Sequence, residues 1–184
     1  VQLEKAATAS RYNLINNGDF THGEYGWTRG RYFETTEMPQ TLSSSAAPQL
    51  DNNVYRIVPL ADKGKHLYQT AYINGEAGDN FVVSAWAKAD SVPLGTIDGV
   101  SRRFGMMVTF GYTDGTTKSF VFSYNPDMDE TNNWQYGAWN VVAEKAYKQI
   151  NVDLQYDFNA NTAYFDGVQF YREEFGSSYT YDED

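Results

Sequence analysis

Hydrophobic and polar residues alternate along several short segments of this chain. The alternation is clearest in residues 81–89 and 149–158. Successive side chains of a β-strand point to opposite faces, so alternation places all the apolar side chains on one face. The apolar positions are Phe81, Val83, Ala85 and Ala87 in the first segment and Ile150, Val152, Leu154 and Tyr156 in the second. Both segments are therefore predicted to be strands with one core face and one mixed face.

Further segments show the same pattern and are separated by turn sequences. One of these, Thr113-Asp114-Gly115, is typical of a hairpin. The predicted strands are 12–15, 54–58, 66–73, 81–89, 103–112, 117–124, 134–142, 149–158 and 163–172. Phe20 and Trp27 are expected in the core, and residues 35–53 are expected to form an irregular connection. Short strands without intervening helical patterns indicate a sandwich or barrel.

Composition supports this fold class and excludes several partners. The 184 residues suit one all-β domain, and aromatic residues make up 16% of them. The formal net charge of −10 argues against nucleic acid and anionic membranes as partners. There is no cysteine, which excludes disulfides and thiolate metal sites. No apolar run reaches the length of about 20 residues that a membrane-spanning helix needs.

Four segments match the strand pattern of a known family. They are Asn13–Phe20 followed by Trp27, Tyr68-Gln69 followed by Phe81–Ala89, Ile150–Tyr156, and Tyr164–Phe170. In this order they resemble strands of the galactose-binding-like jelly-roll carbohydrate-binding modules. The resemblance implies an all-β jelly-roll β-sandwich of two antiparallel sheets over residues 11–173, after a leading segment 1–10. It also implies a non-catalytic module that binds a glycan. The same fold hosts structural and protein-interaction modules, and that alternative stays open.

The last residues carry a second resemblance. The sequence of residues 171–184, with Tyr179, Tyr181 and Asp182, is similar to the entry into the tyrosine–aspartate (YD) repeats of large secreted bacterial proteins of the Rhs and wall-associated type. Residues 174–184 would then begin a repeat region. This resemblance implies an extracellular or cell-surface location and makes the remainder of a longer polypeptide one partner of the module.

The family resemblance also implies one structural calcium ion near the first and last strands. Asp19 and Asp166 stand at the corresponding positions, and hard cations prefer oxygen ligands. Thr21 and Gly167 replace two acidic residues of the family pattern, so capping of turns is the alternative role for both carboxylates. The acidic loop 127–133 lacks the glycine and the final glutamate of a helix-loop-helix calcium site and is interpreted as solvated.

Trp86 is the best single candidate for contact with a sugar, because it lies on the mixed face of the clearest strand. An indole offers an apolar face to the C–H groups of a sugar ring and a polar N–H at its edge. Residues from three strands are predicted to complete one groove, namely Lys88, Arg103, Met107, Thr109, Asp153 and Gln155. Burial of Trp86 under residues 91–103 would favour the structural alternative instead.

Catalysis has little support in the sequence. His22 and His66 are the only histidines, and neither falls in a metal or triad motif. Adjacent carboxylates such as Asp129 and Glu130 point to opposite faces of an extended chain and are poor acid–base partners. The chain is therefore predicted not to be an enzyme.

Overall fold

A computed structural model of the chain describes residues 12–33, 39–41, 53–89, 95–124 and 134–173. Within these ranges the regular elements are all β-strands. They are β1 (Thr28–Arg29), β2 (Pro39–Thr41), β3 (Asn53–Ile57), β4 (Gly64–Ala71), β5 (Asn80–Ala89), β6 (Thr96–Ile97), β7 (Val100–Ser101), β8 (Arg103–Tyr112), β9 (Thr117–Ser123), β10 (Gln135–Val142), β11 (Tyr147–Asp157) and β12 (Ala163–Glu173). No helix among the described residues is long and apolar enough to span a membrane.

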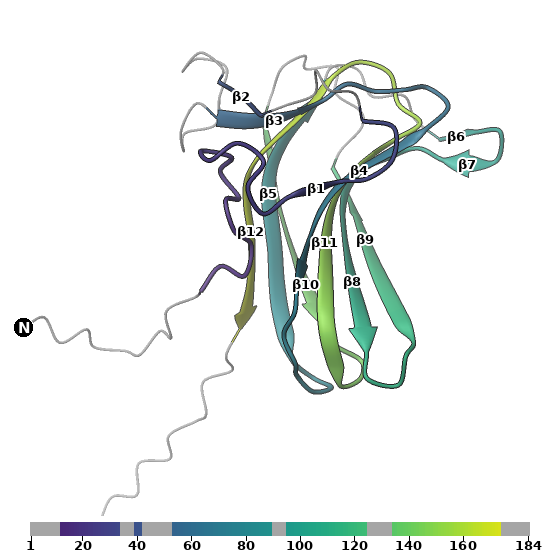
Figure 1. The fold of residues 1–184 in the computed structure, drawn as a ribbon. Helices are drawn as coiled ribbons and strands as arrows, with labels where there is room; N and C mark the ends of the chain where they lie inside the picture. The colour runs from purple at the N-terminus through teal and green to yellow at the C-terminus, as the bar shows by residue number, and fades with distance from the viewer. Residues whose placement is uncertain (1–11, 34–38, 42–52, 90–94, 125–133, 174–184) are drawn as a thin grey trace, which may run out of the picture.

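The strands form two antiparallel five-stranded sheets and one small hairpin. The first sheet has the order β1-β4-β11-β8-β9 and the second has the order β10-β5-β12-β3-β2. Figure 1 shows β8, β9 and β11 side by side in one layer and β5 with β12 in the other. The hairpin of β6 and β7 extends from the main body. This arrangement is the predicted jelly-roll β-sandwich.

The core lies between the two sheets and is rich in aromatic side chains. Phe81 and Phe170 stack with ring centroids 4.9 Å apart, and Phe110 packs against Phe81 at 5.8 Å. The alternating apolar sets of β5 and β11 are almost fully buried, as the sequence pattern predicts. The residues between them on these strands therefore point away from the core, onto the two outer faces of the sandwich.

Most of the predicted strands are present with small shifts at their ends, but residues 12–15 do not form a strand. This segment instead hydrogen-bonds to β12 mainly through one side chain. Asn13 accepts from the Phe170 N–H at 2.9 Å and donates to the Val168 carbonyl at 3.1 Å. The Val168 N–H donates to the Gly18 carbonyl at 2.9 Å, beside an irregularity in β12 between Asp166 and Gln169. These hydrogen bonds, which we term the seam, attach residues 13–18 to β12.

The two predicted core anchors near the beginning are confirmed. Phe20 is 1% exposed and Trp27 is 8% exposed, with their ring centroids 5.4 Å apart. The short strands β1, β2, β6 and β7 are not among the predicted ones, and β2 lies inside the stretch that is expected to be irregular. Residues 1–10, 127–133 and 174–184, for which the sequence makes specific predictions, lie outside the described residues.

Candidate functional site

The residues predicted to form one groove lie on two different sheets. Trp86 and Lys88 belong to β5, whereas the other five belong to β8 and β11. Those five are Arg103, Met107, Thr109, Asp153 and Gln155. All seven occupy outward positions of their strands, so the two groups face away from each other across the sandwich. The expected single groove with Trp86 beside Asp153 is therefore wrong, because alternation fixes the face of a residue but not the sheet to which its strand belongs.

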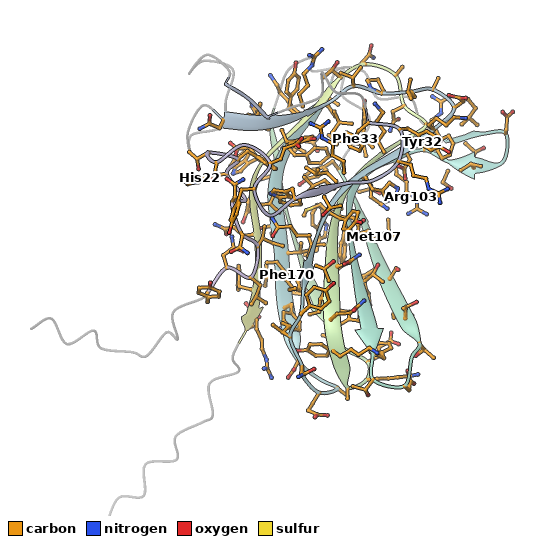
Figure 2. The ribbon with its side chains drawn as sticks, viewed as in Figure 1. His22, Tyr32, Phe33, Arg103, Met107 and Phe170 are labelled. Atoms are coloured by element: carbon orange, nitrogen blue, oxygen red, sulfur yellow. The ribbon has the colours of Figure 1, made fainter. Side chains whose placement is uncertain are left out.

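The larger group lies on the outer face of the first sheet, which we term the β11 face. Its residues are His66, Tyr68, Arg103, Met107, Thr109, Asp153, Gln155 and Asp157. Asp153 is paired with Tyr68 of β4 on one side and with Met107 of β8 on the other. Figure 2 shows Arg103 and Met107 on β8, on the opposite side of the molecule from His22. The register thus brings polar, sulfur-containing and aromatic side chains together across three strands.

The polar side chains of the β11 face are deeply buried although they point away from the core. Asp153 is 5% exposed and Gln155 is 2% exposed. Asp153 Oδ2 and Gln155 Oε1 have no hydrogen-bond partner among the described residues, and the same holds for Asn159 Oδ1 just beyond β11. A buried oxygen without a partner costs about 1–3 kcal/mol, so these atoms carry unused hydrogen-bond acceptor capacity.

The imidazole of His66 lies between the two carboxylates of the β11 face, those of Asp153 and Asp157. Its Nε2 atom lies 3.2 Å from Asp157 Oδ2 in a hydrogen bond and 3.0 Å from Asp157 Oδ1, which lies off the hydrogen-bond direction. Its Nδ1 atom lies 3.6 Å from Asp153 Oδ1. The carboxylates of Asp153 and Asp157 raise the pKa of His66 to about 9. The imidazole is therefore protonated at neutral pH, and neither of its nitrogens is free to act as a general base.

The smaller group lies on the outer face of the second sheet, which we term the β5 face. Its residues are Trp86, Lys88, Trp134, Tyr136, Tyr164 and Asp166. Trp86 is half-buried and lies beside Tyr136, with ring centroids 5.2 Å apart. Lys88 Nζ lies 5.4 Å from the Trp134 ring and 5.2 Å from the Tyr164 ring. Residues 90–94 lie outside the described part of the chain, so the alternative in which residues 91–103 cover Trp86 stays untested.

The remaining tryptophans pack against protein. Trp27 is in the core, as predicted, and Trp139 stacks on Phe122 with ring centroids 5.2 Å apart. Trp134 packs beside the ammonium group of Lys88 on the β5 face. Several other residues of the two faces were not predicted from the sequence; they are His66, Tyr68, Asp157, Asn159, Tyr136 and Tyr164. The alternation in β4 could have placed Tyr68 outward, but only the strand pairing shows that it adjoins Asp153.

The two carboxylates of the expected calcium site lie near the seam between the first segment and β12. Asp19 Oδ1 accepts from the Thr21 hydroxyl at 2.6 Å and from the Thr21 N–H at 3.2 Å. Asp166 Oδ1 accepts from the Gly167 N–H at 2.6 Å. The described residues contain no group of three or more histidines and carboxylates able to hold a metal ion. This donor set fits the turn-capping alternative, and calcium binding stays a prediction.

Comparisons with known proteins identify the fold. No family model matches the sequence, and no curated protein matches it. The structure is similar to a family 16 carbohydrate-binding module, with a TM-score of 0.55 at 15% identity over 86% of this chain and 99% of that chain. It is equally similar to the module TmCBM61 in complex with β-1,4-galactotriose, with a TM-score of 0.55 at 15% identity over 88% of this chain and 99% of that chain.

A third similar structure belongs to a longer protein. It is the enzymatically active domain of the bacteriophage CBA120 tailspike protein 4, with a TM-score of 0.60 at 15% identity over 88% of this chain. The chain spans only 21% of that structure. At identities this low, the similarity shows a shared fold and does not identify a ligand.

Proposed function

We propose that the chain is a non-catalytic carbohydrate-binding module that holds a neutral glycan on its β11 face. The observation that carries this proposal is the pair of buried, outward-pointing oxygens without partners, Asp153 Oδ2 and Gln155 Oε1. Sugar hydroxyls are donors of the right size to satisfy such acceptors. The protonated state of His66 supports binding rather than acid–base catalysis, because both of its nitrogens face carboxylates.

The neighbours of these oxygens suit a sugar ring. Tyr68 lies directly beside Asp153 in the register and is half-buried, so its ring offers an apolar surface at the edge of the polar row. Met107 lies on the other side of Asp153, and its sulfur is 3.5 Å from Gln155 Nε2. A pyranose has both C–H faces and hydroxyl edges, so a row that alternates apolar and polar side chains matches it.

Charge favours a neutral glycan on this face. Asp153 and Asp157 both lie in the row, and the whole chain carries a formal net charge of −10. The protonated His66 and Arg103 on the same face offset these two carboxylates, so this face has no excess positive charge to select carboxylated sugars. The pair of Lys88 and Arg103, which could have selected acidic sugars in a single groove, is divided between the two faces of the sandwich.

The similarity of the last residues to the entry of a YD-repeat region supports a place within a larger secreted bacterial protein.

Binding of soluble neutral oligosaccharides tests the proposal. We expect weak binding, in the micromolar to millimolar range, of at least one member of a panel that includes β-1,4-galactotriose and xylohexaose, measured by calorimetry or by NMR titration. Asp153→Ala and Gln155→Ala should each weaken binding about tenfold, the effect of one lost hydrogen bond to a charged or buried group. Asp62→Asn is the matched control, because it removes an exposed carboxylate from the turn before β4.

Two results would contradict this proposal. One is the absence of binding to every glycan of a broad plant, microbial and host panel. The other is binding that survives unchanged in folded Asp153→Ala and Gln155→Ala proteins, which would place the glycan away from the β11 face.

A further inference from the structure

The β5 face carries an aromatic pair that lies outside the core between the sheets. Trp86 and Tyr136 are partners in the register of β5 and β10, and their rings are tilted by 45° at a centroid distance of 5.2 Å. Tyr136 is 54% exposed, so the pair forms part of the molecular surface. Neither residue belongs to the core cluster between the sheets. Aromatic surface left outside the core in this way costs free energy in water, and an apolar ligand face would cover it.

Two charged residues neighbour this aromatic pair in the sheet. Asp166 is the register partner of Trp86 on the side opposite Tyr136, and it is fully buried. Lys88, two residues along β5, is 5% exposed, and its ammonium group lies near the rings of Trp134 and Tyr164. Both charged groups are thus buried beside the pair, and the exposed surface is made by the two aromatic rings. Their ring faces are apolar, and the indole N–H and the phenol hydroxyl are polar. A sugar ring, with apolar C–H faces and hydroxyl edges, matches this combination.

The β5 and β11 faces are separate sites by geometry. They are the outer faces of two different sheets, with the whole core cluster between them. Packed sheets are about 10 Å apart, so the side chains of the two faces point in opposite directions and cannot share one sugar ring.

We infer that the β5 face is a second glycan-binding site, which stacks a pyranose ring on Trp86 and Tyr136 independently of the β11 face. The sugar is bound by its C–H face on the two rings and by its hydroxyls at the polar edges of those rings, the indole N–H and the phenol hydroxyl. Occupation of this site does not depend on Asp153 or Gln155.

The indole N–H signals of the tryptophans test the inference in the intact chain. The signal of Trp86 is assigned by its loss in Trp86→Phe, and the protein is titrated with β-1,4-galactotriose, xylohexaose and cellohexaose up to their solubility limits. We expect the Trp86 signal to shift with at least one sugar and the signal of Trp139, which packs against Phe122, to stay in place. The same Trp86 shift should remain in Asp153→Ala, with an unchanged dissociation constant. Tyr136→Ala should raise the dissociation constant measured from the Trp86 signal about tenfold, because one aromatic contact with the sugar is lost.

Each outcome is decisive, and the failure of this site differs from the failure of the β11 site. A Trp86 signal that no sugar moves overturns the inference, whether or not the backbone signals of Tyr68 and Asp153 respond. A Trp86 shift that disappears in folded Asp153→Ala also overturns it, because the two faces would then be linked. A Trp86 shift without any response at Tyr68 or Asp153 supports the second site and contradicts the first.

Discussion

His66 of β4 and Asp157 of β11 form an ion pair across two neighbouring strands, with His66 Nε2 3.0 Å from Asp157 Oδ1. The other nitrogen of the same ring lies 3.6 Å from Asp153 Oδ1. One protonated imidazole thereby joins two carboxylates that lie four residues apart on β11. Asp153 uses Oδ1 toward His66, which leaves its Oδ2 as the acceptor without a partner.

This arrangement predicts that the folded chain loses stability in alkaline solution. The carboxylates of Asp153 and Asp157 raise the pKa of His66 to about 9, against an ordinary value of 6.5. A group with a raised pKa in the folded state stabilises it fully below its unfolded pKa, and this contribution disappears as the pH rises through the folded pKa. The melting temperature of the chain should therefore fall between pH 6.5 and pH 9.

The His66→Gln variant is the control for this pH dependence. It keeps a polar side chain of similar length but has no proton to lose in this range. We expect it to melt lower than the original chain at pH 6.5 and to show a much flatter dependence up to pH 9. An equal slope in both proteins would show that other groups cause the loss.

Gly105 on β8 is predicted to tolerate no side chain. A Cβ atom at this position would lie 1.9 Å from the backbone oxygen of Phe122 on β9. Backbone of a paired strand cannot move away as a flexible side chain can, so Gly105→Ala should destabilise the fold by roughly 1–3 kcal/mol or more. Chemical denaturation measures the change, and Thr109→Ala, further along the same strand and face, is the control with a small effect. An unchanged midpoint for Gly105→Ala would contradict the close approach of β8 and β9.

Trp139 is predicted to matter for stability and not for sugar binding. Its ring stacks on Phe122 of β9 at 5.2 Å and contacts Tyr124 edge-on at 5.3 Å, so it joins the edges of the two sheets. Trp139→Ala should lower the free energy of unfolding by about 2 kcal/mol, since a large half-buried ring is lost. Glycan titration below the melting range should give an unchanged dissociation constant. A loss of glycan binding in the folded variant would contradict this prediction, because it would indicate that the glycan contacts this edge of the sandwich.

Asn13 is predicted to be essential for attaching the first segment to β12. Its side chain accepts from the N–H groups of Ile15 and Phe170 and donates to the Val168 carbonyl. Asn13→Ala would leave these backbone groups without partners, at a cost of about 1–3 kcal/mol. Limited proteolysis should then cut residues 12–27 before the sheets. The exposed Asn140→Ala on β10 should behave like the original chain, and an identical digestion pattern for both variants would contradict the role of Asn13.

The sequence predicts the sandwich well because its strands alternate strongly. The observed β8 has the predicted bounds, and β5 differs by one residue at its start. Alternation shows which residues of a strand share a face, and this depends only on the local sequence. Residues 12–15 were predicted wrongly because their hydrogen bonds come mainly from the side chain of Asn13, and a side-chain bond to a distant strand has no periodic signal.

The candidate sites were predicted only in part, for a related reason. Each proposed contact residue is indeed outward, but the division of Trp86 from Asp153 depends on the sheet order, which is set by long-range pairing. His66 was noted in the sequence only as a histidine outside any motif. Its role depends on Asp157, which is 91 residues away and becomes a neighbour only through the pairing of β4 with β11.

The seam between the first segment and β12 also determines how the fold responds to force. The Leu14 N–H donates to the Phe170 carbonyl and the Val168 N–H to the Gly18 carbonyl, so the two stretches run antiparallel. Tension applied near Asn13 and beyond Phe170 acts at the same end of this seam. This tension would break the hydrogen bonds of the seam one after another from that end, rather than load all of them together. The first segment would therefore detach from β12 at low load, because this tension passes through the seam and not through the pairing of β12 with β5.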